Sequence, residues 1–339
     1  MLKASLEKYT LDFKRPSGTS RGVLTQKDSW FIRIWDEKKP EIIGIGEASI
    51  IKTLSPEWNE AYPQFIEKVA ADINSYVHAE IEKLIDYPSI YMAIETALLD
   101  LKRGGTKILF SSDFTSKQAP IKINGLIWMG SKEYMLEQIE EKLVAGFDCI
   151  KLKIGAIDFQ SELDLLAFIR ANYSAEQIEL RVDANGAFAA ETAIDKLKAL
   201  VKYDLHSIEQ PIKQGQFDGM RQLCATTPLP IALDEELIGI TDTLEKRKLL
   251  ETIRPQYIIL KPSLIGGFKG TDEWIAIAED LNIDWWITSA LESNIGLNAI
   301  AQYTFTKNNP LPQGLGTGQL YTNNIPSGLS IEKGHLILK

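Results

Sequence analysis

From Ala119 onward the sequence alternates short apolar runs with longer segments that have helical periodicity. Each apolar run ends at a polar residue or a glycine, and these ends recur roughly every 25–30 residues, enough for one strand, one helix and two short loops. Seven or eight parallel βα units of this kind close into a barrel whose site lies at the carboxyl ends of the strands. The predicted strand ends are Asn124, Lys153, Asp183, Glu209, Asp234, Lys261, Ser289 and Gly316.

The segments between these strand ends have the apolar spacing of helices. The predicted helices span residues 132–145, 158–172, 190–201, 216–224, 244–253 and 269–281. The fold class is therefore α/β, a modified TIM barrel of the (β/α)7β type over residues 119–321.

Residues 1–118 lack the repeat and are predicted to form a separate α+β domain. Antiparallel strands are expected at residues 29–35 and 42–48, and helices at 58–76 and 89–103. The tail, residues 322–339, has the pattern of a small hairpin that packs back on this first domain.

Residues 15–25 read R-P-S-G-T-S-R-G-V-L-T and are rich in Gly, Ser and Thr, which predicts a loop. This loop is either a plain surface connection or a flexible lid. As a lid it would bring Arg15 or Arg21 to an anionic ligand.

Charge and cysteine content exclude several classes of partner. The net charge of −9, with no dense run of Lys and Arg, argues against a nucleic-acid partner. The N-terminus lacks the apolar core of a signal peptide, and no segment has the apolar length of a membrane span. Cys149 and Cys224 are the only cysteines and are expected to be reduced and buried, so we expect a cytoplasmic protein.

The run Cys149 to Gly155, C-I-K-L-K-I-G, has the alternation of a strand. It places Lys151 and Lys153 on the same face, where mutual repulsion and burial would lower the lysine pKa. A lysine of this kind can act as a base near neutral pH. The alternative is an exposed edge strand with a solvated basic face.

Three carboxylates lie at consecutive predicted strand ends: Asp183, Glu209 and Asp234. Arg181 and Asn185 share the face of Asp183 on its strand. Three negative charges in one small region are unfavourable without a cation, and hard oxygen ligands suit Mg²⁺. The alternative is that each acid pairs with a neighbouring base.

In an eight-stranded barrel the second and sixth strands lie opposite each other, so Lys153 and Lys261 would face each other across the mouth. The predicted metal ligands occupy the arc between them. A substrate carboxylate bound to the metal would have one lysine on each face of its α-carbon. This layout suits removal of a proton next to a carboxylate.

The motifs K-L-K, R-V-D-A-N-G, S-I-E-Q-P, A-L-D-E and I-L-K-P-S resemble the enolase superfamily, muconate-lactonizing-enzyme subgroup, over essentially the whole chain. The resemblance implies that the first domain caps the barrel. It also implies that Lys153 and Lys261 are the acid/base pair and that Asp183, Glu209 and Asp234 bind Mg²⁺, with Mn²⁺ as a substitute. The mandelate-racemase subgroup uses a His-Asp dyad, for which the chain has no histidine at a matching position.

Within the subgroup, the last two strands and the 15–25 segment resemble the o-succinylbenzoate synthases. Dipeptide epimerases carry an acidic D-x-D motif where this chain has Q-G-L-G-T-G. The resemblance implies a lyase of menaquinone synthesis that dehydrates 2-succinyl-6-hydroxy-2,4-cyclohexadiene-1-carboxylate. The residues expected to contact the substrate are Arg21, Lys151, Arg181, Ser289, Asn294, Gly316 and Thr317, with Asn185 supporting the metal ligands.

Two other functions stay open. A racemase of N-succinylamino acids or a dipeptide epimerase would use the same pair of lysines, and a non-catalytic barrel would bind the metal alone. In each enzymatic case the partner is a small carboxylate, and the sequence leaves the oligomeric state open.

Overall fold

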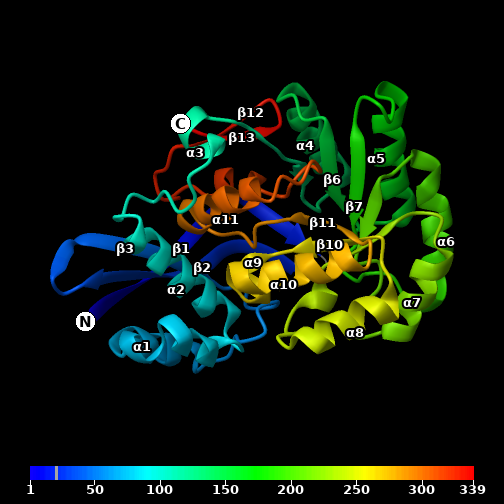
Figure 1. Ribbon diagram of the computed structural model, residues 1–339. Helices are drawn as coiled ribbons and strands as arrows, with labels where there is room; N and C mark the ends of the chain where they lie inside the picture. The colour runs from blue at the N-terminus through cyan, green and yellow to red at the C-terminus, as the bar shows by residue number, and fades with distance from the viewer. Residues whose placement is uncertain (20–21) are drawn as a thin grey trace.

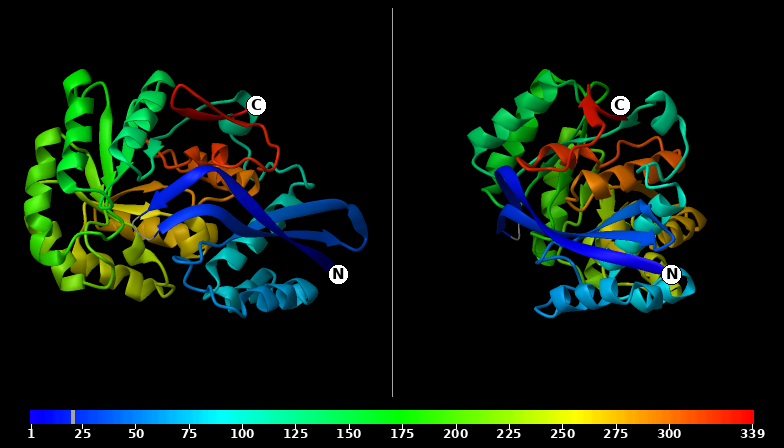
Figure 2. Two further views of the ribbon diagram at one scale, coloured as in Figure 1. Left: turned by 180° about the vertical axis from the view of Figure 1, so that it is seen from behind. Right: turned by 90° about the vertical axis from the view of Figure 1, so that its left-hand side faces the viewer.

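The computed structural model describes residues 1–19 and 22–339. Its N-terminal part is an antiparallel sheet in the order β1-β2-β3 with helices packed against it (Figures 1 and 2). The two strands predicted at residues 29–35 and 42–48 lie within β2 and β3. The elements are β1 (Leu2–Thr19), β2 (Gly22–Asp36), β3 (Lys39–Ser49), α1 (Tyr62–Ala71), the 3-10 turns η1 (Ile73–Ser75) and η2 (His78–Leu84), and α2 (Pro88–Lys102).

Helix α2 packs so closely on β3 that the strand needs glycine at the contact. A Cβ atom on Gly46 would lie 1.8 Å from the carbonyl oxygen of Ala93, and one on Gly44 would lie 2.0 Å from that of Ala97. The G-I-G run of β3 therefore sets how near the helix approaches the sheet. Helix α1 is shorter than the predicted 58–76 because Pro63 lies in its first turn and 3-10 turns follow it.

The prediction of a loop at residues 15–25 is wrong for the described part of this segment. Strands β1 and β2 continue through it, with Ser17 opposite Leu24 and Gly18 opposite Val23, after a register shift between Asp12 and Ser17. Gly18 also forms a β-bridge to Met129 of the barrel. Backbone pairing across the two strands and to the barrel thus outweighs the loop-forming composition of this segment. Arg21 lies outside the described residues.

The second part is a curled sheet of seven parallel strands in the order β11-β10-β9-β8-β7-β6-β5. Helices cover its outer side (Figures 1 and 2). The strands are β5 (Gly125–Ile127), β6 (Cys149–Lys153), β7 (Glu179–Asp183), β8 (Ser207–Glu209), β9 (Ile231–Leu233), β10 (Tyr257–Leu260) and β11 (Asp284–Ile287).

The eighth position of the barrel is held by a pair of isolated bridges. Gln313 forms a parallel bridge to Ile123, and Gly314 forms one to Thr288 at the end of β11. The segment that follows is the 3-10 turn η5 (Gly316–Gln319). The barrel closes there without a full strand, and the predicted strand end at Asn124 instead precedes β5.

Helices α4 to α8 and α10 lie close to their predicted bounds, because each has an apolar stripe and several also have a clear N-cap. Ser131, Asp158, Asp242 and Ser293 are N-caps whose side chains accept backbone N–H groups. The helices are α3 (Asp113–Lys117), α4 (Lys132–Val144), α5 (Phe159–Asn172), α6 (Ala190–Leu200) with η3 (Val201–Tyr203), α7 (Phe217–Thr226), η4 (Glu235–Leu237), α8 (Thr243–Ile253), α9 (Pro262–Ile265), α10 (Gly267–Asp280) and α11 (Asn294–Thr306).

The C-terminal tail divides its contacts between the two parts. Asn323 is bonded to Thr10 and Asp12 of β1. The hairpin of β12 (Leu329–Glu332) and β13 (His335–Leu338) instead pairs with β4 (Ile121–Lys122), at the start of the barrel.

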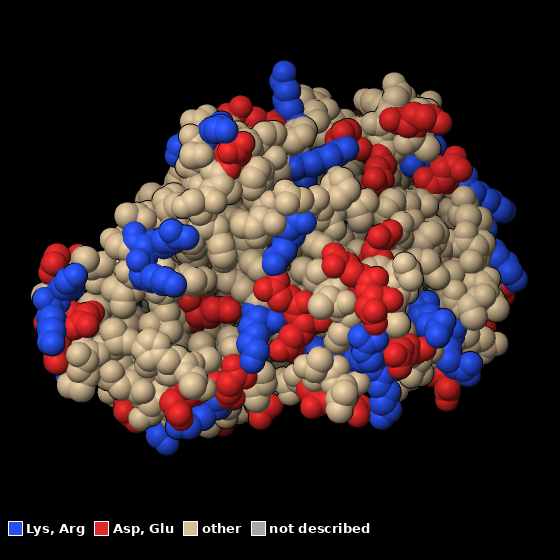
Figure 3. All heavy atoms as spheres, in the orientation of Figure 1, with Lys and Arg blue, Asp and Glu red and all other residues tan. Residues whose placement is uncertain are grey.

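The surface carries acidic and basic side chains interspersed over the face seen in Figure 3. None of the helices in the described ranges combines the length and the apolar character that a membrane crossing requires.

Candidate active site

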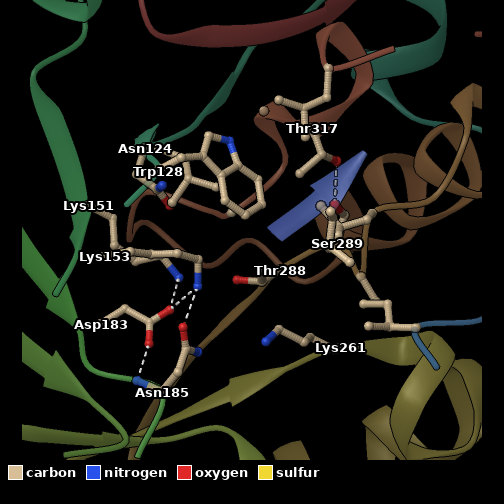
Figure 4. A pocket seen from close by; sticks show the side chains of 18 of the residues that line it. Asn124, Trp128, Lys151, Lys153, Asp183, Asn185, Lys261, Thr288, Ser289 and Thr317 are labelled. Carbon is tan, nitrogen blue, oxygen red and sulfur yellow. Dashed lines mark hydrogen bonds and ion pairs between the residues drawn. The ribbon is translucent and has the colours of Figure 1, made fainter. Parts of the chain in front are cut away.

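A cavity of about 220 Å³ lies at the carboxyl ends of the barrel strands, beside the β1–β2 hairpin (Figure 4). Its polar lining combines residues from distant parts of the sequence, and its apolar lining comes partly from the hairpin. The polar residues are Thr53, Asn124, Lys142, Lys151, Lys153, Asp183, Asn185, Lys261, Thr288, Ser289 and Thr317. The apolar residues include Val23, Leu24, Ile51, Leu54, Leu126, Trp128, Leu291 and Leu320.

Lys151 and Lys153 both extend from β6 toward the carboxylates of the next two strands. Lys153 Nζ lies 2.8 Å from Asp183 Oδ2, and Lys151 Nζ lies 2.6 Å from Glu209 Oε2 and 3.5 Å from Asp183 Oδ2. All four side chains are buried. The parallel register of β6, β7 and β8 sets Lys153 level with Asp183 and Asp183 level with Glu209, so the contacts follow from strand pairing.

Lys261, directly after β10, closes the network from the other side. It pairs with Asp234 and lies 3.9 Å from Glu209 Oε1. Three ammonium groups thus face the three carboxylates. The three carboxylates therefore do not require a metal for charge balance, because pairing with the lysines also balances them in this structure.

The pKa of Lys151 shifts in the direction opposite to the sequence prediction. Burial alone lowers the pKa of Lys151, but the charges of Glu209 and Asp183 outweigh it, and the net shift is upward. Burial also lowers the pKa of Lys261, but the surrounding carboxylates, Asp234 above all, together raise it by more, and the net shift is again upward. Repulsion between lysines is a minor effect here because carboxylates surround each ammonium group.

The carboxylates do not share this charge equally. Burial, and then repulsion from Asp183, raises the pKa of Glu209 to about 8. Burial also opposes ionisation of Asp183, but Lys153 and Lys151 hold its pKa below the ordinary value. Glu209 thus holds a proton more readily than a free carboxylate, although Lys151 and Lys261 lie near its two oxygens.

The donor set fits a hard divalent cation in its chemistry. Glu209 Oε1 is buried without a hydrogen-bond partner, so it has capacity for a further positive ligand. In the described ranges no three His, Cys, Asp or Glu side chains are already arranged to hold a metal ion. Metal binding would therefore require Asp183, Glu209 and Asp234 to turn from the lysines toward a shared ion.

Asn185 supports the network from the turn after β7, where its backbone has a φ of 44°. Its Oδ1 accepts a hydrogen bond from Lys153 Nζ at 2.8 Å, and its Nδ2 donates to Glu235 Oε1 at 3.1 Å. On the opposite wall the hydroxyl groups of Ser289 and Thr317 are hydrogen-bonded to each other (Figure 4). Gly316 lines the cavity beside Thr317.

Two of the residues expected to bind substrate lie elsewhere. Arg181 is 1 % exposed and lies below the cavity, with its Nε 2.7 Å from Glu179 Oε1 and its Nη1 2.9 Å from the Pro312 carbonyl oxygen. Its guanidinium also stacks 4.2 Å from the Trp286 ring. These contacts make Arg181 part of the barrel interior. Arg181 lies two residues before Asp183 on β7, and so it lies deeper in the barrel than the strand end.

Asn294 also faces away from the cavity. Its Nδ2 donates to the Ile325 carbonyl oxygen at 2.7 Å, and its backbone N–H donates to Asn324 Oδ1 at 2.9 Å. It therefore holds the C-terminal tail at the start of α11 rather than a ligand. The first N–H groups of α11 already donate to protein acceptors, so the N-terminus of this helix is not open to an anion.

Trp128 is a cavity residue that the motif search missed. Its ring centroid lies 5.8 Å from Lys153 Nζ, and Gln138 holds its backbone by accepting from the Trp128 N–H at 2.9 Å and donating to its carbonyl oxygen at 3.0 Å. Figure 4 shows the indole above the two lysines. Its place in the run I-W-M-G, four residues after the predicted strand end at Asn124, is the signal that could have found it.

The chain is similar in sequence to known proteins of one family. Residues 134–339 match the family described as Enolase C-terminal domain-like. The o-succinylbenzoate synthase of Desulfotalea psychrophila is 48% identical over 99% of this chain and 98% of the relative.

Solved structures share the architecture of the whole chain. The crystal structure of MenC from D. psychrophila has a TM-score of 0.87 and 44% identity, covering 99% of each chain. A dipeptide epimerase from Enterococcus faecalis, complexed with Mg and the dipeptide L-Leu-L-Tyr, has a TM-score of 0.85 at 22% identity, covering 100% of this chain and 97% of the other, and shows likeness of fold alone. The motifs, the lysine and carboxylate geometry and these matches agree, and the chain belongs to the enolase superfamily, in the Enolase C-terminal domain-like family.

Proposed function

We propose that the chain is an o-succinylbenzoate synthase, a lyase that converts 2-succinyl-6-hydroxy-2,4-cyclohexadiene-1-carboxylate to o-succinylbenzoate and water in menaquinone synthesis. The observation that carries the proposal is the 48% identity to an o-succinylbenzoate synthase over 99% of the chain. The cavity supports it, because lysines lie on two sides of a space with both polar and apolar walls.

Lys153 is the proposed base. Its Nζ takes the proton from the α-carbon beside the ring carboxylate, and the electron pair of the broken C–H bond becomes a ring double bond as the C–O bond breaks. The leaving hydroxyl takes the same proton from Lys153 and departs as water, so the lysine returns to its starting state. Asn185, 2.8 Å from Lys153 Nζ, keeps the amine aimed into the cavity.

Lys261 is proposed to act through its charge. It lies across the cavity from Lys153, and its ammonium group is held by Asp234. A fixed positive charge at this place stabilises the negative charge that develops on the substrate after proton loss. Dehydration from one face needs no proton from Lys261.

Asp183, Glu209 and Asp234 are proposed to hold Mg²⁺, with Mn²⁺ as a substitute. The ion would supply positive charge for the substrate carboxylate oxygens. Relatives of the same fold are known as complexes with Mg, including dipeptide epimerases from E. faecalis and Cytophaga hutchinsonii. Glu209 Oε1, which has no hydrogen-bond partner, and the raised pKa of Glu209 are the features of this chain that support the assignment.

The two ends of the substrate fit the two walls of the cavity. Lys151 and Lys153 face the reacting carboxylate, while Ser289 and Thr317 offer hydroxyl groups to the succinyl carboxylate. Trp128 and the apolar side chains pack against the ring. Residues 313–318 contain no acid that would bind a substrate ammonium, which disfavours a dipeptide.

Steady-state assays on the purified protein with Mg²⁺ test the function. We expect o-succinylbenzoate to form from the cyclohexadiene far faster than N-succinyl amino acids are racemized or dipeptides are epimerized. Faster racemization would move the assignment to N-succinylamino-acid racemase. Metal binding without turnover or proton exchange on any of the three substrate classes would indicate a non-catalytic barrel.

A further inference from the structure

The loop after β11, residues 288–293, forms one wall of the cavity in a strained conformation. Thr288, Ser289, Ala290 and Leu291 all line the cavity. Leu291 has a φ of 63°, and no other aliphatic residue has a positive φ in the described ranges. A branched side chain in this left-handed region is unfavourable, so the surrounding structure must impose it.

Groups from outside the barrel strands hold this loop on both sides of Leu291. Tyr321 donates its hydroxyl hydrogen to the Leu291 carbonyl oxygen at 2.7 Å, and Ser49 donates to the Ala290 carbonyl oxygen at 3.3 Å. Glu47 of β3 accepts from Ser293 N–H at 2.9 Å and from Ser293 Oγ at 2.5 Å. The N-terminal sheet therefore contacts the loop through the loop's backbone and through Ser293, the N-cap residue of α11.

Glu47 is a fully satisfied buried carboxylate. It is 1 % exposed, and besides Ser293 it accepts from Gly296 N–H at 2.9 Å and from Ser29 Oγ at 2.7 Å. The buried Lys27 donates to Ser29 Oγ at 2.9 Å and lies 4.0 Å from Glu47, so it balances the charge. A Cβ atom at Gly296 would lie 3.0 Å from Glu47 Oε2, so the helix approaches the carboxylate at a position free of side chain.

The same loop is tied to the segment that carries the second lysine. Glu292 is fully buried and accepts a hydrogen bond from Ser263 Oγ at 2.6 Å. Ser263 lies two residues after Lys261, in α9. A displacement of the loop would therefore move the cavity wall and the turn after Lys261.

We propose that Glu47 is a positioning residue for substrate binding, which holds residues 288–293, and with them Ser289 and Leu291, in the conformation that receives the substrate. The inference rests on the proposed function and adds a residue from the N-terminal sheet to it. Glu47 does not line the cavity and acts through Ser293 and the start of α11. Its bonds offset the backbone strain at Leu291.

The first test compares Glu47→Gln with a matched control, Glu57→Gln. Glu57 is also a buried glutamate of the N-terminal part, and its Oε1 accepts from Ser89 N–H at 2.9 Å at the start of α2. Both variants lose a charged cap on a helix, so both are expected to unfold more easily. Only Glu47→Gln should raise KM for the cyclohexadiene, by roughly tenfold, with kcat changed less than about threefold.

Hydrogen exchange gives a readout that does not depend on the substrate. In Glu47→Gln the amides of residues 288–297 should exchange faster than in the wild type, whereas in Glu57→Gln they should not. Unchanged exchange there, or an unchanged KM in folded Glu47→Gln, would overturn the proposal. A wild type that makes no o-succinylbenzoate would remove the proposed function, while the exchange comparison would still test the loop.

A second variant keeps the proposal testable should Glu47→Gln fail to fold. Leu291→Gly relieves the strained φ but also removes a buried side chain and adds freedom to the unfolded chain, so we expect a lower Tm together with a KM raised by roughly tenfold. Arg254→Gly is the control, because Arg254 has a φ of 52° at the end of α8, outside the cavity lining. It should raise Tm and leave KM unchanged. Leu291→Gly with an unchanged KM would contradict the role given to the loop.

Discussion

Lys153 and Lys261 lie on two sides of one cavity (Figure 4), and each is paired with a different carboxylate, Asp183 for Lys153 and Asp234 for Lys261. They come from β6 and from the position directly after β10. A racemase would use both lysines for proton transfer, one on each face of the substrate. A dehydratase working on one face needs a proton acceptor on that face and a charge on the other.

The first prediction concerns the proposed base. Lys153→Ala should lower kcat for dehydration by on the order of 10²–10⁴ or more, because the proposed base is lost and Lys151, on the same strand, is held by Glu209 and Asp183. Lys246→Ala is the control, since Lys246 is equally buried and paired with Glu273, away from the cavity. We expect the control to lose stability and to keep kcat. Both are read by steady-state assay and urea unfolding, and a Lys153→Ala enzyme with wild-type kcat would rule Lys153 out.

The second prediction separates charge from proton transfer at Lys261. Lys261→Arg keeps a positive charge but does not readily release a proton, whereas Lys261→Ala removes both. Dehydration should therefore persist better in Lys261→Arg than in Lys261→Ala, and any racemase side activity should vanish in both. The two activities are measured on both folded variants. Equal loss of dehydration in the two variants would exclude a role through charge alone.

The third prediction concerns the metal. Exhaustive chelation should abolish dehydration, and Mg²⁺ or Mn²⁺ should restore it. By calorimetry, Glu209→Gln should bind Mg²⁺ roughly tenfold or more weakly, because affinity follows the number of charged oxygen ligands. Glu236→Gln is the control, as the buried Glu236 accepts from Gly215 N–H and lies outside the cavity lining. Full turnover after chelation would contradict the metal assignment.

The fourth prediction is a pH dependence of stability at Glu95. This α2 carboxylate accepts from the N–H groups of Phe268 and Lys269 at the start of α10, at 2.6 and 3.2 Å. Burial raises its pKa from 4.5 to about 7, against the opposing effect of these N–H donors. The folded state thus holds the Glu95 proton more tightly than the unfolded state. The stability that the protonated Glu95 contributes is full below about pH 4.5 and is lost as the pH rises through about 7.

Urea unfolding at pH 4.5 to 8 measures this effect. The side chain of Glu95→Gln cannot titrate. As the pH rises from 4.5 to 8, the free energy of unfolding of this variant should therefore increase relative to that of the wild type, by up to about 3 kcal/mol. Other titrating groups cancel in the difference between the two proteins. A difference that stays constant with pH would mean that Glu95 titrates near its ordinary value in the folded protein.

Most of the barrel could be read from the sequence because its signals are local. The helical stripes of α4 to α8 and α10 and the N-caps of α4, α5 and α8 lie within single segments, and so does the alternation of β6. The five proposed catalytic and metal residues could be named because each ends an apolar run, and parallel strands bring such ends to one rim.

What the tertiary structure alone decided depends on contacts between distant segments. Residues 15–25 have the composition of a loop, yet pairing of β1 with β2 and the bridge to Met129 make the described part of them strand. Arg181 shares the face of Asp183, but its depth along β7 places it in the barrel interior, beside Trp286. Sequence alternation gives the face of a strand and not the distance from the barrel mouth.

Long-range electrostatics was equally hidden from the sequence. Two lysines on one strand predicted a lowered pKa, but carboxylates from neighbouring strands surround Lys151 and raise it. The hydrogen bond between Ser293 and Glu47 joins residues 246 positions apart, and neither of the two local sequences predicts it. Local residue order determined the elements and the chemistry at their ends, whereas the packing of the N-terminal sheet on the barrel decided charges, depth and loop conformation, because these depend on which distant groups meet.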